Sequence, residues 1–249
     1  MKRSHRRHLK QDELVHGLDS AMTWSQRHGK NILNITLVVV GAGLLLGGLA
    51  IYRSRQAQSA HTLFSAALKQ FHGVVLSGTG AEPTPGVATF KSSNERYQAS
   101  LLAFQDVAEN FGGYDAGRLA EYYMSICHIA LGNLDVGLNS LETVREGKRD
   151  LLYYLASRSL AAVKIEVGDF VGASEMYRSL VDDPENPLPK DYLLFALGKN
   201  EERTGNNVQA QQYYERILAE HPTSQLRGEV TERNDALKVD GLRSPEIVD

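Results

Sequence analysis

The sequence predicts an all-α protein in which one transmembrane helix is followed by a stack of paired helices. Three observations predict this fold class. Residues 31–52 contain no charged side chain, the segment before them is rich in Lys and Arg, and a pattern of small and large residues recurs after position 120 with spacings of 36 and 37 residues.

The uncharged stretch 31–52 is long enough to cross a lipid bilayer. As a helix its 22 residues extend roughly 33 Å, and a bilayer's hydrocarbon core is about 30 Å thick. Its polar residues Asn31, Asn34 and Thr36 lie near one end, where lipid headgroups would be. A buried helix of a soluble protein is the alternative, but such a helix rarely runs so far without a polar face. We therefore expect a transmembrane helix over 31–52, with the lipid bilayer as its surroundings.

The distribution of basic residues predicts the orientation of this helix. Residues 1–30 hold seven Lys or Arg and three acidic side chains, whereas only two arginines follow the span before Lys69. Because an excess of basic residues marks the cytoplasmic side, we expect 1–30 to be a cytoplasmic basic head. The chain after the span is then extracytoplasmic. A cleaved signal peptide is the rival interpretation, but its apolar region is usually only about 7–15 residues long.

Shorter segments flank the span on both sides. We expect residues 1–10 to be disordered and 11–28 to form a short helix that Gly29 ends. After the span, apolar residues at spacings of three and four predict a helix over 53–76 that continues the membrane helix outward. Residues 77–93 are rich in Gly and Pro and predict a loop, which is long for a compact domain.

From position 94 onward the sequence predicts helical repeats. Small and large residues recur in a fixed order, most completely at Gly198, Gly205, Ala210, Tyr214 and Pro222, then at Ala161, Gly168, Ala173, Tyr177 and Pro184, and earlier at Ser125, Gly132, Gly137 and Leu141. This is the tetratricopeptide repeat pattern, with Glu201 in place of its usual tyrosine. Small residues let paired helices approach, and large ones fill the groove of the next pair, so that the pairs stack.

The repeat pattern also sets the domain limits. Ser100, Phe104 and Val107 fit the second helix of a still earlier unit, whose first helix would be 53–76. We therefore predict a periplasmic tetratricopeptide-repeat α-solenoid over 53–238, with about three to four helix pairs and a capping helix. Residues 239–249 are expected to form a disordered tail.

No motif in the sequence indicates catalysis. The eight histidines never show the spacing of a metal site, and the single cysteine, Cys127, cannot form an intrachain disulfide. We therefore predict no catalytic, cofactor or metal site, and no enzyme. The whole chain has a net charge of −3 and residues 1–30 carry +4, so residues 31–249 carry −7. An acidic balance gives no indication of nucleic-acid binding.

Two surfaces are candidates for protein contacts. The first helix of each repeat lines the concave side of a stack, and five residues occupy slots expected to face it: Tyr122, Arg158, Tyr192, Phe195 and Lys199. A groove with aromatic and basic groups suits a bound peptide, although a merely solvated face is the alternative. In the span, Gly43 and Gly47 form a GxxxG pattern that could seat a second membrane helix, including that of another copy in a homo-oligomer.

The order of elements resembles the ancillary SecYEG translocon subunit family of bacterial inner-membrane proteins. The similarity includes Asp12-Glu13, Leu18 and Trp24, the segment 28–30 that enters the span, and the helix 60–68 after it. It implies an inner-membrane protein with Sec translocon subunits, periplasmic chaperones or secreted clients as partners. The long segment 77–93 departs from the family layout. A structural subunit of an envelope complex, oligomerising through its membrane helix, is the alternative function.

Overall fold

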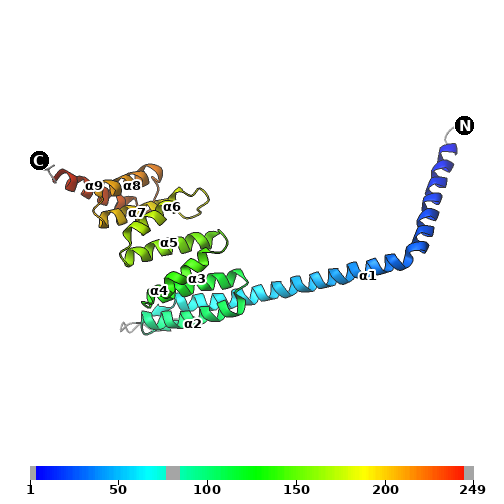
Figure 1. Cartoon of the computed structure of the whole chain (residues 1–249), viewed down its shortest axis with the longest axis horizontal. Coiled ribbons are helices and arrows are strands. Elements are labelled where there is room, and N and C mark those ends of the chain that lie inside the picture. Colours follow the sequence, from blue (N-terminus) through cyan, green and yellow to red (C-terminus); the bar gives the residue numbers. More distant parts are fainter. Residues whose placement is uncertain (1–3, 77–84, 244–249) are drawn as a thin grey trace. The chain divides into compact units, whose positions relative to one another are not determined.

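The computed structural model describes the backbone of residues 4–76 and 85–243, and the side chains of residue 34 and of residues 36–76 and 85–239. Within these residues the protein is mostly helical (Figure 1). They form nine helices and one small sheet. The elements are α1 (Ser4–Phe71), β1 (Val74–Val75), β2 (Thr89–Phe90), α2 (Ser93–Phe111), α3 (Asp115–Ala130), α4 (Leu134–Arg145), α5 (Leu151–Glu166), α6 (Phe170–Asp182), α7 (Lys190–Arg203), α8 (Asn207–Glu220) and α9 (Arg227–Arg243). The chain divides into two units, Met1–Gln56 and Ala57–Asp249.

The helix α1 is continuous over 68 residues. Residues 4–10 of the segment expected to be disordered (1–10) are part of this helix, and residues 1–3 lie outside the described residues. The helix also passes through Gly29, which was expected to end a separate helix, so for the described residues both expectations were wrong. The physical reason is that no proline occurs before position 83, and an isolated glycine lowers helix propensity by only about 1 kcal/mol. The expected continuation of the helix beyond residue 52 is confirmed.

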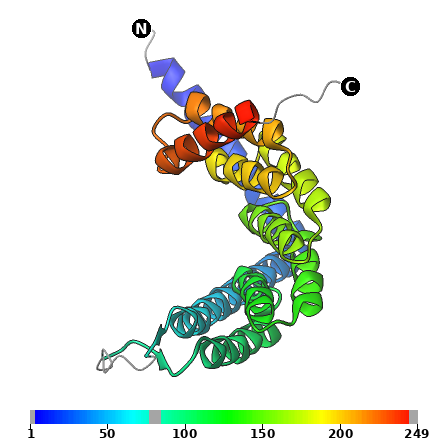
Figure 2. The same ribbon diagram turned by 90° about the vertical axis from the view of Figure 1, so that its left-hand side faces the viewer.

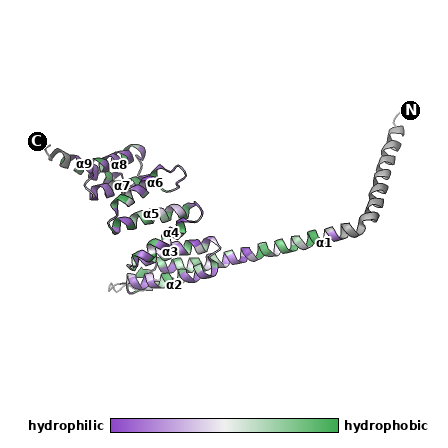
Figure 3. Cartoon of the chain, in the orientation of Figure 1, coloured by the Kyte–Doolittle hydropathy of each residue, from purple (hydrophilic) through white to green (hydrophobic). Residues whose placement is uncertain are grey.

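The apolar part of α1 is exposed within its own unit. From Thr36 onward this helix is long and apolar enough to cross a membrane, and Figure 3 shows hydrophobic residues along it. None of its most apolar window is buried. Leu44 and Leu45 are 73% and 77% exposed. The side chains of residues 31–33 and 35, at the start of the predicted span, lie outside the described residues. The core helix of a soluble protein would bury such leucines, whereas here they are exposed within the chain.

The helix expected over 53–76 ends earlier, at Phe71, and the segment expected to be a loop contains a strand. Val74–Val75 pairs in parallel with Thr89–Phe90. Gly73 makes this pairing possible, because a Cβ atom there would lie 2.4 Å from the Phe90 ring and 2.8 Å from the Ala88 carbonyl oxygen. Residues 77–84 lie outside the described residues. The side chain of Ser92 caps α2 by accepting a hydrogen bond from the Glu95 amide, which sets the start of that helix.

Each helix from α3 to α9 packs against the one before it (Figure 2). The residues expected to fill the spaces between helices, Phe104, Leu141, Tyr177 and Tyr214, are all 5% exposed or less. Their buried neighbours form three clusters, along α1 to α3, along α3 to α5, and along α5 to α9. The first cluster includes Phe64 from the end of α1, whose ring centre lies 5.7 Å from that of Phe104.

Three glycines end alternate helices in the same way. Gly132, Gly168 and Gly205 follow α3, α5 and α7 with φ angles of 85°, 86° and 78°. A side chain is strongly disfavoured in this left-handed conformation, so glycine is the residue that lets the chain reverse after a short turn. At the other end of the chain, α9 extends to Arg243 rather than ending near 238. Residues 244–249 of the expected tail lie outside the described residues.

Candidate functional site

The structure separates the five residues predicted to bind a partner. Tyr122 is a core residue, only 8% exposed, and its hydroxyl lies 3.1 Å from the Ser159 hydroxyl of α5. Its predicted role as a groove contact was therefore wrong. The reason is packing: the small side chain of Ser159 leaves space between α3 and α5, and the Tyr122 ring lies in it.

Arg158 on α5 and Tyr192 on α7 are exposed, and they remain available to a partner. Phe195 and Lys199 are half-buried instead. The Phe195 ring packs against Tyr214 with ring centres 6.1 Å apart, and the Lys199 ammonium lies 5.4 Å from its centre. On this side of α7 the side chains therefore pack mainly against other parts of the protein.

Helix α9 covers part of the same surface of α7. The Arg233 guanidinium lies 5.8 Å from the centre of the Phe195 ring and bonds Glu202 at 2.9 Å. Glu202 also accepts a hydrogen bond of 2.8 Å from the Tyr214 hydroxyl. Burial, and next the Glu202 carboxylate, raise the pKa of Tyr214, so this hydroxyl stays protonated as a donor. The contacts of α9 thus fix the C-terminal end of the stack.

A pocket of about 430 Å³ lies between α3 and α5, beside the start of α4. Its lining is mainly aliphatic, with Ile126, Ile129, Leu134, Ala162 and Val163, and its polar residues are Ser159 and Glu166. Sequence reasoning missed it. Ile126 and Ala162 lie one helical turn after Tyr122 and Arg158, so the opening occurs one turn beyond the predicted slots. The small residue at 162, facing a larger one at 126, is the sequence feature that could have indicated it.

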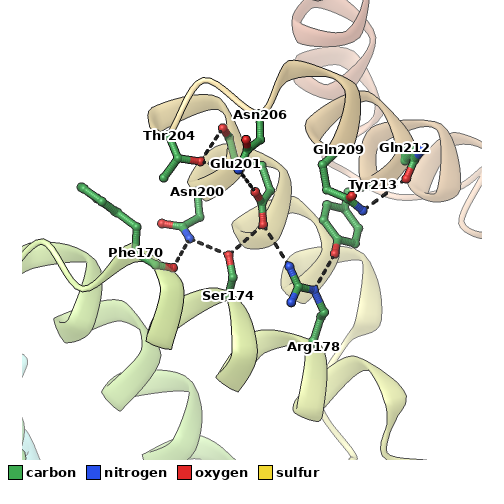
Figure 4. A network of polar contacts seen from close by, with 10 residues as sticks. All are labelled: Phe170, Ser174, Arg178, Asn200, Glu201, Thr204, Asn206, Gln209, Gln212 and Tyr213. Atoms are coloured by element: carbon green, nitrogen blue, oxygen red, sulfur yellow. Dashed lines mark hydrogen bonds and ion pairs between the residues drawn. The ribbon is translucent and has the colours of Figure 1, made fainter.

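The residue that departs from the repeat pattern, Glu201, lies in a buried polar network (Figure 4). Its carboxylate accepts hydrogen bonds from Ser174 at 2.8 Å, from Arg178 at 3.3 Å and from Asn206 at 2.8 Å. Asn200 extends the network, because its amide donates to Ser174 and to the Phe170 carbonyl oxygen. The network joins α6, α7 and the turn before α8. With its charge fully bonded, Glu201 has the environment of a structural residue rather than of an acid or base.

Other candidates for chemistry are also accounted for by packing. Cys127 is buried, and burial raises its pKa to about 12 although Arg96 acts in the opposite direction. A protonated, inaccessible thiol is a poor nucleophile. In the part of the chain that the structure describes, no three His, Cys, Asp or Glu side chains form a group that could hold a metal ion.

Gly43 and Gly47 lie on exposed parts of α1, and a Cβ atom added at either would meet no atom within 4 Å. The helix surface at these positions is therefore open to a neighbouring helix. Comparison with protein-family models finds none that matches the chain, and a search of curated proteins finds no match either.

Proposed function

We propose that this chain is a single-pass inner-membrane protein whose helical unit is a tetratricopeptide-repeat adaptor on the periplasmic face. The exposed apolar side chains of α1 support the anchor. The basic residues of 1–30 support a cytoplasmic N-terminus. The helical unit then binds other proteins, and the anchor holds it at the membrane.

The observation that carries the repeat assignment is the recurrence of one local design. Each of α3, α5 and α7 ends in a glycine with positive φ, and a small residue of the next helix is buried five residues later, at Gly137, Ala173 and Ala210. At Gly137 an added Cβ atom would lie 2.5 Å from the Ile129 side chain, so this pair of helices requires a small residue there. Repeats of this kind usually present a surface for partner peptides.

Available surface for such a partner includes Arg158, Tyr192 and the apolar pocket between α3 and α5. The partner classes are those implied by the resemblance of the layout: Sec translocon subunits, periplasmic chaperones or secreted clients. No constellation in the described residues favours an enzyme. The alternative function, a structural subunit that oligomerises through the span, is favoured by one observation, the open surface at Gly43 and Gly47.

Site-specific photocrosslinking in the native membrane tests the proposal. A photoreactive residue in place of Tyr192, which is 48% exposed, should give crosslinks to translocon subunits or chaperones. The same residue in place of Val208 on α8, which at 72% is more exposed than Tyr192, is the control and should give none of them.

Two further variants separate the proposal from its alternative. With the photoreactive residue kept at 192, Arg158→Ala should weaken these crosslinks, since interfaces depend on a few central residues. Phe195 is left unchanged because it packs against Tyr214. Replacing residues 31–52 by an unrelated span without GxxxG should leave the crosslinks intact. If the span exchange removes them and Arg158→Ala does not, the oligomeric subunit replaces the adaptor.

A further inference from the structure

We propose that the pocket between α3 and α5 binds an aliphatic side chain of a partner polypeptide that carries a Lys or Arg beside it. This inference rests on the proposed adaptor function and adds the chemistry of what is bound. It follows from the lining of the pocket, the charge at its mouth and the surface next to it.

The lining selects an apolar occupant. Five of its residues are aliphatic, and Ser159, one of the two polar ones, already has its hydroxyl in a hydrogen bond with Tyr122. A polar group placed against these walls would lose its bonds to water without replacement. An aliphatic side chain instead gains about 25 cal/mol for each Å² of apolar surface that it removes from water. The volume of about 430 Å³ leaves room for such a side chain.

The charge at the mouth selects a basic neighbour. Glu166 is exposed, and within the described residues no side chain forms an ion pair or hydrogen bond with it. Lys164, two residues earlier on α5, forms its ion pair with Asp169 instead. Two helices, α3 and α5, end beside the pocket and contribute partial negative charge, whereas only one, α4, begins there and contributes partial positive charge, so that the balance of the helix ends is negative. A Lys or Arg next to the buried aliphatic group would complement this charge.

The surroundings favour a polypeptide over a small molecule. Ala162, in the pocket wall, is exposed, so the cavity is open to solvent along α5. Arg158, also exposed, lies one turn earlier on the same helix. A peptide that inserts a side chain at Ala162 would therefore pass Arg158 on one side and Glu166 on the other. Its basic residue would lie on the Glu166 side.

Selection from a random 12-residue peptide display library, with the full chain in lipid nanodiscs, tests the inference. Peptides retained by the protein should share a Leu, Ile or Met within four residues of a Lys or Arg. Binding of one synthetic selected peptide is then measured by fluorescence anisotropy. Ala162→Trp, which fills the pocket, should weaken it at least about tenfold, as expected for loss of a central anchor. Ala219→Trp, at an exposed alanine of α8, should not change it.

A charge exchange tests the basic neighbour separately. Glu166→Lys should weaken binding about threefold, in the range of a surface ion pair, and a peptide with Glu in place of its Lys or Arg should recover it. Glu146→Lys, at another exposed carboxylate, is the control. Circular dichroism establishes that all variants stay folded.

Two results would overturn the inference: no selected peptide binds the Ala162→Trp variant more weakly than the wild type, or the selected peptides are acidic beside their aliphatic residue. A small apolar molecule found by native mass spectrometry in the wild type but not in Ala162→Trp would assign the pocket to that molecule instead. If this inference fails but crosslinks from position 192 persist in Ala162→Trp, the adaptor function still stands.

Discussion

Replacing Gly198 by alanine should destabilise the helical unit, although the same change usually stabilises a helix. A Cβ atom at 198 would lie 2.4 Å from Cε1, 2.8 Å from Cζ and 2.9 Å from Cδ1 of Tyr214. Ordinary contacts of this type are longer than about 3.4 Å, so the ring would have to move by roughly 1 Å. Tyr214 is fully buried and its hydroxyl is bonded to Glu202, so it has little freedom to move.

The expected magnitude is the difference of two effects. Overpacking usually costs about 1–3 kcal/mol, and because Tyr214 can hardly move we expect about 2–3 kcal/mol here. Alanine returns about 1 kcal/mol of helix propensity. We expect a net loss of about 1–2 kcal/mol, which in a domain of this size lowers the melting temperature by about 2–8 °C.

Circular dichroism of the full chain in detergent measures the effect of Gly198→Ala. The control is Gly228→Ala on α9, where an added Cβ atom meets nothing within 4 Å and stability should stay equal or rise. If Gly198→Ala melts at or above the wild-type temperature, the close approach of α7 and α8 has been assigned wrongly.

Three further predictions concern single residues. Glu201→Ala should lower the free energy of unfolding by about 1–3 kcal/mol, because the buried Ser174 hydroxyl loses its acceptor and Arg178 and Asn206 lose a bonded carboxylate; a loss below about 0.5 kcal/mol in denaturant titration would contradict this. Gly73→Ala should separate β1 from β2, since its Cβ atom would lie 2.8 Å from a backbone oxygen, and faster proteolytic cleavage within 77–93 would be the sign; an unchanged cleavage rate would refute it. For Asp150, burial acts to raise the pKa, but hydrogen bonds from Arg118 and from the amides of residues 153 and 152 outweigh burial and lower it. A carboxyl group whose pKa is lowered by folding stabilises the folded state above its unfolded pKa of about 3.9, and this stabilisation is lost as the pH falls through the folded pKa. Asp150→Asn should therefore have a lower melting temperature than the wild type at pH 7, and the difference should shrink at pH 3. A difference that does not change with pH would exclude this contribution.

The sequence predicted the helices well because their signals are local. Hydrophobic spacing, the glycines at 132, 168 and 205, and the absence of proline before residue 83 each act within a few residues. The pairing of β1 with β2 was missed because it depends on contacts across the intervening segment and on the space above Gly73. The start of α1 was misjudged because its polar composition resembles that of a disordered segment.

The candidate site was predicted less well, because the exposure of a side chain depends on the helix facing it. Tyr122, Arg158 and Phe195 occupy equivalent positions, yet Tyr122 is buried over Ser159 and Arg158 is exposed. The role of Glu201 likewise depends on Ser174 and Arg178 of α6, which no local pattern connects to it. The pocket arises where small Ala162 faces Ile126, a pairing between helices rather than within one.

Labelling of single cysteines from one side of the membrane tests most directly the claim that the apolar stretch of α1 separates a cytoplasmic head from an external helical unit. Cys127 is buried with a raised pKa, so it gives little background. In intact cells of a Gram-negative host, a membrane-impermeant maleimide should label Ser65→Cys, whose parent side chain is exposed beyond the span. It should label Ser20→Cys only after permeabilisation. Labelling of Ser20→Cys but not Ser65→Cys would reverse the orientation, and equal labelling of both in intact cells would mean that the helix does not cross the membrane.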